Sequence, residues 1–374
     1  MAKPSAEEIT ASTRAELSNT PYACSELTVL SGGTANFLYK GTLTKPLPDG
    51  TTHVVVKHAE DFVKNNPAFS LSTDRCRFEE ASLEAVQAGL GAVSAGQFTV
   101  KTPRLLHYNP RTNTQVQEYA PGTLDLKNYA LTFWTPTSSE LKSQCHDLGR
   151  SLGSWLRKFH NWADLPEQEG LRGTVKQNVG MQKLKHLINY PNSLSSASSH
   201  PQILGNEEVM STIKEVVAMA EKELQDESKL GIIHGDFWTG NALVPARSFG
   251  ARGDSVTVDI IDWELVQMGV RPLDLGQMIA ELYELKLFKA IDAGVWIIEG
   301  FSEGYGTMDD EFAFRTSIHV GCHLLNFSGV PGWGTQEKVE SVVDKGVDIL
   351  VKAWKKDRSW FEGMELGCLF VKKQ

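Results

Sequence analysis

Two short apolar segments, each followed within three residues by an aspartate, constrain the fold of this chain more than any other feature. The first is GII, which leads into HGD at residues 234–236, and the second is VTVDII, which leads into DWE at residues 262–264. Short apolar runs rich in β-branched residues are typical of strands, and a residue just after a strand lies in a loop where its side chain can point into a cleft. The two segments therefore predict two strands that carry Asp236 and Asp262 at their ends.

The residue types at these strand ends suit phosphoryl transfer. Asp236 can orient or deprotonate an attacking hydroxyl, which is the task of a carboxylate in that chemistry. Asn241 and Asp262 offer the hard oxygen ligands that Mg²⁺ prefers, so the two residues predict a magnesium site on the phosphates. The alternative is a hairpin with two surface acids. The remaining parts occur in the expected order along the chain, which favours phosphoryl transfer.

The chain changes character near residue 120, which predicts two lobes of an α+β fold. Between residues 27 and 119 the segments LTVLSGGTANFLYKGTL, THVVVKH and NTQVQEYA have strand character, and DRCRFEEASLEAVQAGL has helical periodicity. After residue 122 most segments have helical periodicity. We expect a small β-rich lobe at residues 1–120 and a larger, mainly helical lobe at residues 121–374. The Ser-rich stretch NYPNSLSSASSHP is expected to be a mobile surface loop.

The motif HGDFWTGN at residues 234–241, followed by a strand and DWE, resembles the signature of the aminoglycoside phosphotransferase and choline kinase-like family. That family has a bilobal protein-kinase-like fold, with a β-rich N-lobe and a mainly helical C-lobe. The run D-x-E-x4-G-x4-D-x-G that begins at Asp262 is most similar to the methylthioribose kinase-like branch, which includes fungal hydroxytryptamine kinases. The resemblance spans about residues 27–356 in short islands. It implies that Asp236 is the catalytic base and that Asn241 and Asp262 bind magnesium, with ATP as phosphoryl donor.

The predicted small lobe contains two candidate phosphate-binding features. The first is a glycine turn between two strands, where backbone N–H groups can approach phosphate because glycine has no Cβ. Taken alone, the turn is more typical of an ordinary hairpin. The second is Lys57 at the end of VVVK, which suits a lysine that reaches the α- and β-phosphates; the alternative is a solvated lysine at a strand end. The residues of the glycine turn are Ser31, Gly32, Gly33, Thr34, Ala35 and Asn36.

Two further features of the small lobe complete the predicted nucleotide site. Such a lysine is held by an acid on the following helix, for which we choose Glu79 because it shares a helix face with apolar residues. Glu80 and Glu84 remain alternatives. The connector of Gln117, Glu118, Tyr119 and Ala120 resembles the hinge whose backbone holds adenine.

Two candidate acceptor-binding residues lie at the end of the DWE motif and in the segment after it. Glu264 is its last residue, and Glu281 lies seven residues after Asp274. Choline kinases have a similarly placed acid that faces the choline cation, so the resemblance implies that Glu281 binds an amine. The alternative for Glu281 is a solvated helix glutamate.

His323 and Trp333 are two more candidates on the acceptor side. His319 and His323 are four residues apart and could ligate a metal, but no third ligand is spaced to join them, which favours pocket lining or core packing. Trp333 lies in a turn where an aromatic ring can cap a cation or a flat ring. The alternative for Trp333 is a packed loop anchor.

Composition limits the partners and the compartment. The chain has 46 Asp and Glu against 37 Lys and Arg, a formal net charge of −9, which argues against nucleic acid or an anionic membrane as partner. No apolar run approaches the roughly 20 residues that span a bilayer, and the first residues lack the apolar core of a secretory signal. Five scattered cysteines without CxxC spacing indicate reduced thiols. We therefore expect a soluble, cytoplasmic protein; its oligomeric state is open.

These features predict a kinase that uses ATP and Mg²⁺ to phosphorylate a hydroxyl of a small molecule. The acceptor classes are a thioribose-type sugar, an amino alcohol, a hydroxyindole amine and an aminoglycoside, and the acidic composition favours an amine-bearing one. A non-catalytic, pseudokinase-like nucleotide-binding module is one alternative, but Lys57, Asp236, Asn241 and Asp262 are all intact. A protein kinase is the other, but HGD replaces HRD, DWE replaces DFG and no APE segment is recognisable.

Overall fold

The computed structural model of the chain describes residues 3–135, 138–249, 254–329 and 333–370. The chain forms two compact units, Met1–Gly89 with Thr102–Pro121 and Leu90–Lys101 with Gly122–Gln374. The first unit is built mainly on strands and the second mainly on helices, which confirms the predicted α+β class. The second unit includes residues 90–101, which the sequence boundary at residue 120 assigns to the first lobe.

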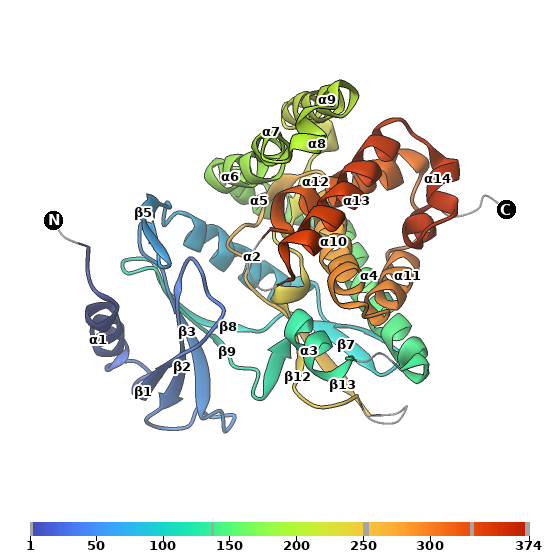
Figure 1. The fold of residues 1–374 in the computed structure, drawn as a ribbon. Helices are drawn as coiled ribbons and strands as arrows, with labels where there is room; N and C mark the ends of the chain where they lie inside the picture. Colours follow the sequence, from blue (N-terminus) through green and yellow to red (C-terminus); the bar gives the residue numbers. More distant parts are fainter. Residues whose placement is uncertain (1–2, 136–137, 250–253, 330–332, 371–374) are drawn as a thin grey trace. The chain divides into compact units, whose positions relative to one another are not determined.

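The described part of the first unit contains a five-stranded antiparallel sheet in the order β1-β2-β3-β9-β8, a short β4–β5 hairpin and two helices (Figure 1). The elements of this unit are α1 (Ala6–Leu17), β1 (Cys24–Val29), β2 (Phe37–Leu43), β3 (His53–His58), β4 (Phe62–Val63), β5 (Asn66–Ser70), α2 (Arg75–Gly89), β8 (Leu105–Asn109) and β9 (Thr114–Glu118).

Side chains alternate along a strand, so the two faces of this sheet carry different residues. One face packs in an apolar cluster and the other carries Lys57. Val54 and Val56 of β3 are fully buried in one apolar cluster with Ile9 and Leu17 of α1. Lys57, one position further, therefore points to the opposite face. That face is the one on which α2 supplies a partner for the lysine.

The second unit has its own five-stranded sheet, in the order β10-β12-β13-β7-β6, together with a β11–β14 pair and the remaining helices. Its elements are β6 (Val93–Ala95), β7 (Phe98–Lys101), β10 (Thr123–Asp125), α3 (Leu126–Phe133), α4 (Lys142–Ala163), α5 (Glu169–Val175), α6 (Val179–Asn189), α7 (Pro191–Ser198), α8 (Pro201–Leu204), α9 (Glu207–Glu223), β11 (Gly231–Ile233), β12 (Ala242–Pro245), β13 (Val256–Ile260), β14 (Gln267–Gly269), α10 (Pro272–Lys289), α11 (Ala293–Tyr305), α12 (Asp310–Phe327), α13 (Gln336–Trp354) and α14 (Arg358–Glu362), with a 3₁₀ turn at Thr239–Asn241.

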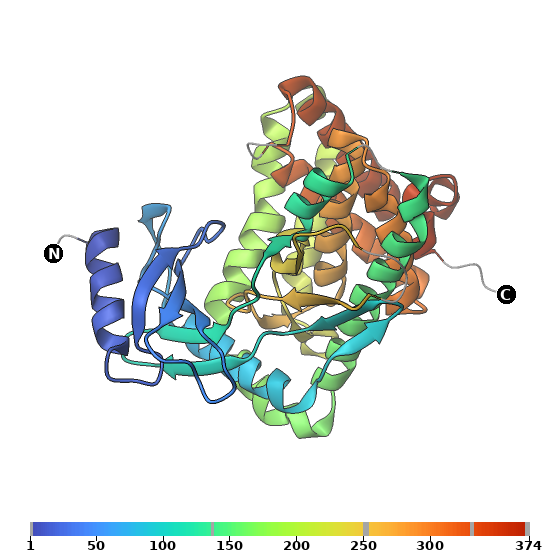
Figure 2. The ribbon, with the colours of Figure 1, turned by 90° about the horizontal axis from the view of Figure 1, so that it is seen from below.

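The strands of the second unit position the polar loops. β11 ends just before HGD, β12 begins just after Asn241, and β13 ends just before Asp262. β12 and β13 are antiparallel neighbours, while β7 pairs with β13 in parallel, so the cyan and yellow strands lie side by side in Figure 2. This arrangement brings the two sequence motifs to the same end of the β12–β13 pair.

Helices α4 and α11 pack backbone against backbone through small residues. A Cβ on Gly149 or Gly153 of α4 would lie 2.1 Å from the carbonyl oxygen of Ile297 or Phe301 of α11. Gly300 of α11 is equally close to α4, with its would-be Cβ 2.0 Å from a backbone oxygen. Glycine is therefore the residue that permits this close approach.

Two segments differ from the sequence expectation. The Ser-rich stretch is not a loop, since Pro191–Ser198 forms helix α7. Proline at the first helical turn favours helix initiation, and Ser193 and Ala197 are buried. The other segment is residues 93–101, for which the sequence patterns name no element and where β6 and β7 form a hairpin. Within the described ranges, no helix has the length and apolar character needed to cross a membrane.

Candidate active site

In the first unit, Lys57 forms a buried ion pair with Glu79 of α2. Lys57 Nζ lies 2.8 Å from Glu79 Oε1, and the two side chains are 7% and 1% exposed. The other carboxylate oxygen of Glu79 accepts a hydrogen bond of 3.1 Å from Gln115 Nε2, on the strand beside β3. Both carboxylate oxygens of Glu79 therefore have partners, which holds the Glu79 side chain in place and with it the ammonium group of Lys57. Of the alternatives on this helix, Glu80 is half-buried and Glu84 is exposed.

The glycine turn precedes β2 and is open to solvent in part. Ser31, Gly32 and Thr34 are exposed, and Gly32 has a φ of +105°, a conformation that glycine adopts without strain. Asn36 is different, because it is buried and its Oδ1 accepts a hydrogen bond of 2.7 Å from Arg75 Nη2. Its side chain therefore ties the end of the turn to α2.

The predicted hinge residues lie at the end of β9. The backbones of Gln117 and Glu118 pair with β3, and the Gln117 side chain donates to Gln115 Oε1 at 2.8 Å. Tyr119 lies next to the ring of His53 and under the ammonium group of Lys40.

In the second unit, a buried carboxylate holds the HGD loop. The N–H groups of His234 and Gly235 donate to the two oxygens of Asp274, at 2.8 and 2.9 Å. His160 Nε2 lies 3.1 Å from the same carboxylate. Gly235 has a φ of +79°, and a Cβ there would lie 2.1 Å from the carbonyl oxygen of Leu265, so this turn requires glycine.

The side chain of His234 braces the loop. Burial lowers its pKa, so the imidazole is neutral. Nε2 then donates to the carbonyl oxygen of Ile261 at 3.2 Å, and Nδ1 accepts from the N–H of Asp236 at 3.3 Å. The imidazole thus links the HGD loop to the strand end that carries Asp262.

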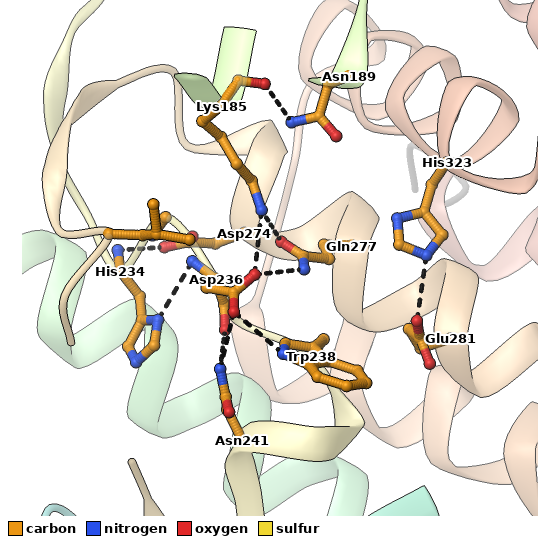
Figure 3. Close-up of polar contacts among 12 residues, drawn as sticks. Lys185, Asn189, His234, Asp236, Trp238, Asn241, Asp274, Gln277, Glu281 and His323 are labelled. Carbon is orange, nitrogen blue, oxygen red and sulfur yellow. Dashed lines mark hydrogen bonds and ion pairs between the residues drawn. The ribbon is translucent and has the colours of Figure 1, made fainter. Parts of the chain in front are cut away.

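Asp236 is the centre of a polar network (Figure 3). Its Oδ1 accepts from Lys185 Nζ at 3.1 Å and from Gln277 Nε2 at 2.8 Å. Its Oδ2 accepts from Trp238 Nε1 at 3.2 Å and from Asn241 Nδ2 at 3.0 Å. Burial raises the pKa of Asp236, but the charge of Lys185 and the hydrogen bond from Gln277 outweigh it, so the pKa lies below its ordinary value. The group is an ionised carboxylate with 23% of its side chain exposed.

Asn241 and Asp262 lie just beyond the same end of the β12–β13 pair. The N–H of Ile261 donates to the carbonyl oxygen of Asn241 at 3.0 Å, and Asp262 is the next residue. The side-chain N–H₂ of Asn241 donates to Asp236, which turns its amide oxygen away from that carboxylate. The amide oxygen of Asn241 and the carboxylate of Asp262 are the ligand types that fit Mg²⁺. Asp262 has a φ of +67°, a conformation that is uncommon outside glycine but that aspartate and asparagine adopt more often than most residues.

A second acidic cluster lies along α10 and α12. Glu281, Glu284 and His323 are buried, and one ligand atom from each lies within 4.8 Å of the others. Glu281 Oε1 is 3.2 Å from His323 Nε2, and Glu281 Oε2 accepts from Thr239 Oγ1 at 3.3 Å. The cluster is therefore linked to the HGD loop, three residues beyond Asp236.

Two atoms of this cluster have no hydrogen-bond partner among the described residues. They are Glu284 Oε2 and His323 Nδ1. Glu284 Oε1 accepts from Ser328 Oγ at 3.1 Å. Burial and the neighbouring charge of Glu281 raise the pKa of Glu284 well above its ordinary value. A buried carboxyl with an unused oxygen is costly, so this cluster can gain free energy by binding a donor or a cation.

The other acceptor-side candidates have partners of their own. Trp333 is buried and stacks on Phe288, with Lys127 Nζ 3.6 Å from the centre of its ring, so the cation on this ring is a lysine of the chain itself. His319 Nδ1 lies 3.0 Å from the hydroxyl of Tyr190, so the two histidines of α12 have different partners. Glu264 is buried in the turn after Asp262.

The sequence motifs do not indicate Lys185, Gln277, Glu284 or Gln115. A signal for the first exists, because Lys185 falls on the inner stripe of α6 with the buried Met181 and Asn189. A second signal lies in α10, where Asp274, Gln277, Glu281 and Glu284 follow the 3-4-3 spacing of one helix face. For Gln115 no local pattern is informative, because its role depends on a helix 36 residues away.

Comparison with known proteins agrees with this geometry. The profile of the phosphotransferase enzyme family (APH) matches residues 45–310. Phosphotransferase FrzJ of Cladobotryum is 33% identical over 374 residues, covering 95% of this chain and 94% of the relative. A 4-hydroxytryptamine kinase of Psilocybe cyanescens is 24% identical, covering 88% of each chain.

Solved structures agree at the level of the fold. A choline/ethanolamine kinase family protein from Mesorhizobium loti aligns with a TM-score of 0.50 at 15% identity, covering 94% of this chain and 99% of that one. The family match spans more than half of the chain and includes both motif-bearing strand ends. This chain belongs to the phosphotransferase enzyme family, as its HGD and DWE motifs predict.

Proposed function

We propose that this protein transfers the γ-phosphoryl group of ATP to a hydroxyl group of a small molecule, with Asp236 as the catalytic base. The observation that carries the proposal is the ionised, partly exposed carboxylate of Asp236, held by four donors beside the magnesium-type pair of Asn241 and Asp262. Phosphoryl transfer depends mainly on positioning and charge neutralisation, and this network supplies the positioning.

Asp236 receives a proton in the proposed step. The acceptor hydroxyl donates a hydrogen bond to the carboxylate, which orients its oxygen toward the phosphorus atom. As the new O–P bond forms, the bond to the ADP oxygen breaks and the hydroxyl proton passes to Asp236. The depressed pKa of Asp236 keeps the carboxylate ready to accept that proton at neutral pH.

The remaining predicted residues bind the nucleotide in this proposal. Lys57, held by Glu79, neutralises phosphate charge, and the turn of residues 31–36 offers backbone N–H groups. The backbone of Gln117, Glu118 and Tyr119 holds adenine. Asn241 and Asp262 hold Mg²⁺, which when bound neutralises the charge that develops on the phosphate oxygens.

We further propose that the acceptor carries an amine, which the Glu281–Glu284–His323 cluster recognises. An ammonium group has three N–H donors, and the cluster offers acceptors that are buried and in part unused. A divalent metal is the other ligand that this cluster fits. The amine is favoured because relatives of this chain are named 4-hydroxytryptamine kinases, after an acceptor with both a hydroxyl and an amine.

We also propose a cytoplasmic location. Four of the five cysteines are buried, and Cys24, Cys145, Cys322 and Cys368 are free thiols. Free thiols persist in reducing compartments.

The proposal is tested by measuring ADP formation with ATP and Mg²⁺ against a panel of hydroxyl-bearing amines, amino alcohols, sugars and aminoglycosides. We expect turnover on an amine-bearing member. In Asp236→Asn, kcat should fall by about 10²–10⁴-fold, the usual contribution of a general base, while ATP binding stays within a few-fold. A variant with wild-type kcat would remove Asp236 from the mechanism.

A further inference from the structure

Lys185 is a buried lysine at the centre of the Asp236 network, although it comes from a helix that carries none of the family motifs. It lies on α6, and its side chain is 4% exposed. Its Nζ donates to Asp236 Oδ1 at 3.1 Å and to Gln277 Oε1 at 2.7 Å (Figure 3). Gln277 Nε2 donates in turn to the same Asp236 oxygen at 2.8 Å, which closes a triangle of hydrogen bonds.

Stability alone is a poor reason for a lysine in this position. Taking an ammonium group out of water costs several kcal/mol, and a buried ion pair repays this cost incompletely in most proteins. An apolar side chain on the inner stripe of α6, beside Met181, would pack without that cost. The charge of Lys185 lies against the carboxylate that must keep a defined orientation for the proposed reaction.

The two oxygens of Asp236 are held in different ways. A carboxylate has about four lone-pair positions, and four donors occupy them here. On Oδ1 both donors, Lys185 and Gln277, are buried and bonded to each other. On Oδ2 one donor is the indole N–H of Trp238, which is partly exposed and, at 3.2 Å, the longest of the four contacts. The Trp238 contact is the one that an incoming hydroxyl can replace most easily.

We infer that Lys185 is a positioning residue for phosphoryl transfer. Together with Gln277 it fixes Oδ1 of Asp236, so that Oδ2 remains to receive the hydrogen bond of the substrate hydroxyl, which replaces the hydrogen bond from Trp238 Nε1. This inference rests on the proposed function of Asp236. Lys185 acts through the carboxylate of Asp236. One of its two hydrogen bonds goes to Asp236 itself, and the other goes to Gln277, which also donates to Asp236. The α6 segment thereby gains a role in the reaction.

The test is a double-mutant cycle with Lys185→Met and Asp236→Asn, read as kcat and as KM for ATP and acceptor. We expect Lys185→Met alone to lower kcat by about 10²-fold, the loss that follows when a reacting group is misplaced by about 1 Å. KM for ATP should stay within about twofold. In the Asp236→Asn background the same change should alter the residual kcat by less than about threefold, because residues that act through one group are not additive.

The matched control is Lys183→Met, which removes an exposed lysine two residues away on the same helix and should leave kcat unchanged. Lys185→Gln keeps a hydrogen-bond donor and serves as second variant if thermal unfolding shows that Lys185→Met does not fold. A loss of equal size in both backgrounds would reduce Lys185 to a structural role and overturn the inference. So would wild-type kcat in Lys185→Met. An inactive wild-type protein would overturn the proposed function first and this inference with it.

Discussion

The surroundings of Glu284 disfavour the ionised form of its carboxyl group and raise its pKa. Glu284 is fully buried on α10, one helical turn from Glu281, and the only nearby lysine charge that lowers its pKa among the described groups is that of Lys127. Burial and the charge of Glu281 together raise its pKa well above its ordinary value of 4.5. In the unfolded chain the same group ionises near that ordinary value.

This difference predicts a dependence of stability on pH. Between the ordinary pKa and the raised one, the folded protein binds the proton and the unfolded chain does not, so the free energy of unfolding falls as pH rises. Glu284→Gln stays neutral and should lose this dependence. We expect the free energy of unfolding of the variant to gain on that of wild type by up to about 1.4 kcal/mol per pH unit as pH rises, so its thermal midpoint should also rise relative to wild type. Exposed Glu167→Gln is the control, and parallel curves for wild type and Glu284→Gln would contradict the raised pKa.

The acceptor amine gives a second prediction for this cluster. Glu281→Gln should lower kcat/KM for an amine-bearing acceptor by about 10–100-fold, since a charge-assisted hydrogen bond contributes about 1.5–3 kcal/mol. An analogue of the same acceptor without the amino group should be phosphorylated equally by both proteins. The measurement is the steady-state kcat/KM of both proteins on the two compounds. An equal loss of kcat/KM on both compounds would mean that Glu281 has a structural role through its contact with Thr239.

How far residue roles can be predicted depends on whether their partners are close in sequence. Asp236, Asn241 and Asp262 stand in or beside recognisable strand ends, so their positions could be predicted. Their roles stay predictions. Lys185 could not be predicted in the same way, because its contact with Asp236 depends on how α6 packs, 51 residues earlier in the chain.

The α4–α11 pair shows what two elements need to pack closely. Their glycines face one another, and each would-be Cβ meets backbone, which cannot rotate aside as a side chain can. This glycine seam, formed by Gly149 and Gly153 of α4 and Gly300 of α11, allows one close distance between the two helices. It also anchors the helix that carries His160, one of the partners of Asp274.

This seam predicts a clear difference between two glycine substitutions. Gly153→Ala places a Cβ 2.1 Å from the carbonyl oxygen of Phe301 and should destabilise the protein by about 1–3 kcal/mol or more. Gly173→Ala in α5 has no heavy atom within 4 Å and should be neutral or stabilise by up to about 1 kcal/mol. Thermal unfolding of the two variants is the measurement; equal midpoints would mean that α4 and α11 do not approach this closely.

Most elements could be predicted, and those that could not have physical reasons. The strand at THVVVKH and the helix after residue 75 have strong periodicity and are present as β3 and α2. Composition misleads at the Ser-rich stretch, where proline at the helix start and two buried small residues produce α7. The β6–β7 hairpin is short, and it is completed by pairing with β13 more than 150 residues later, which no local pattern contains.

At the scale of the whole chain, the α+β class and the family follow from sequence, while the exact division of the units does not. Residues 90–101 precede the predicted boundary yet belong to the second unit, because β7 pairs with β13. Thiol chemistry is also a property of the whole chain. Cys24, Cys76, Cys145 and Cys322 are buried and Cys368 is half-buried.

The native protein should therefore react slowly with a chromogenic aromatic disulfide. Burial raises the pKa of Cys145, Cys322 and Cys368 to about 12, which suppresses the thiolate that is the reactive form. We expect fewer than one thiol per chain to react within minutes, and all five after denaturation. Five fast thiols in the native protein would mean that these side chains are not packed as described.

The bonds from Asp274 to the HGD loop have a consequence for the thermodynamics of binding. Because a buried carboxylate holds two successive N–H groups of this loop, the loop loses its conformational freedom when the chain folds and not when a ligand arrives. Ordering a segment on binding leaves a large unfavourable entropy in titration calorimetry. Acceptor binding to this protein should lack that unfavourable entropy from the HGD loop, because the loop is already ordered in the folded chain. The affinity should then depend on contacts and desolvation.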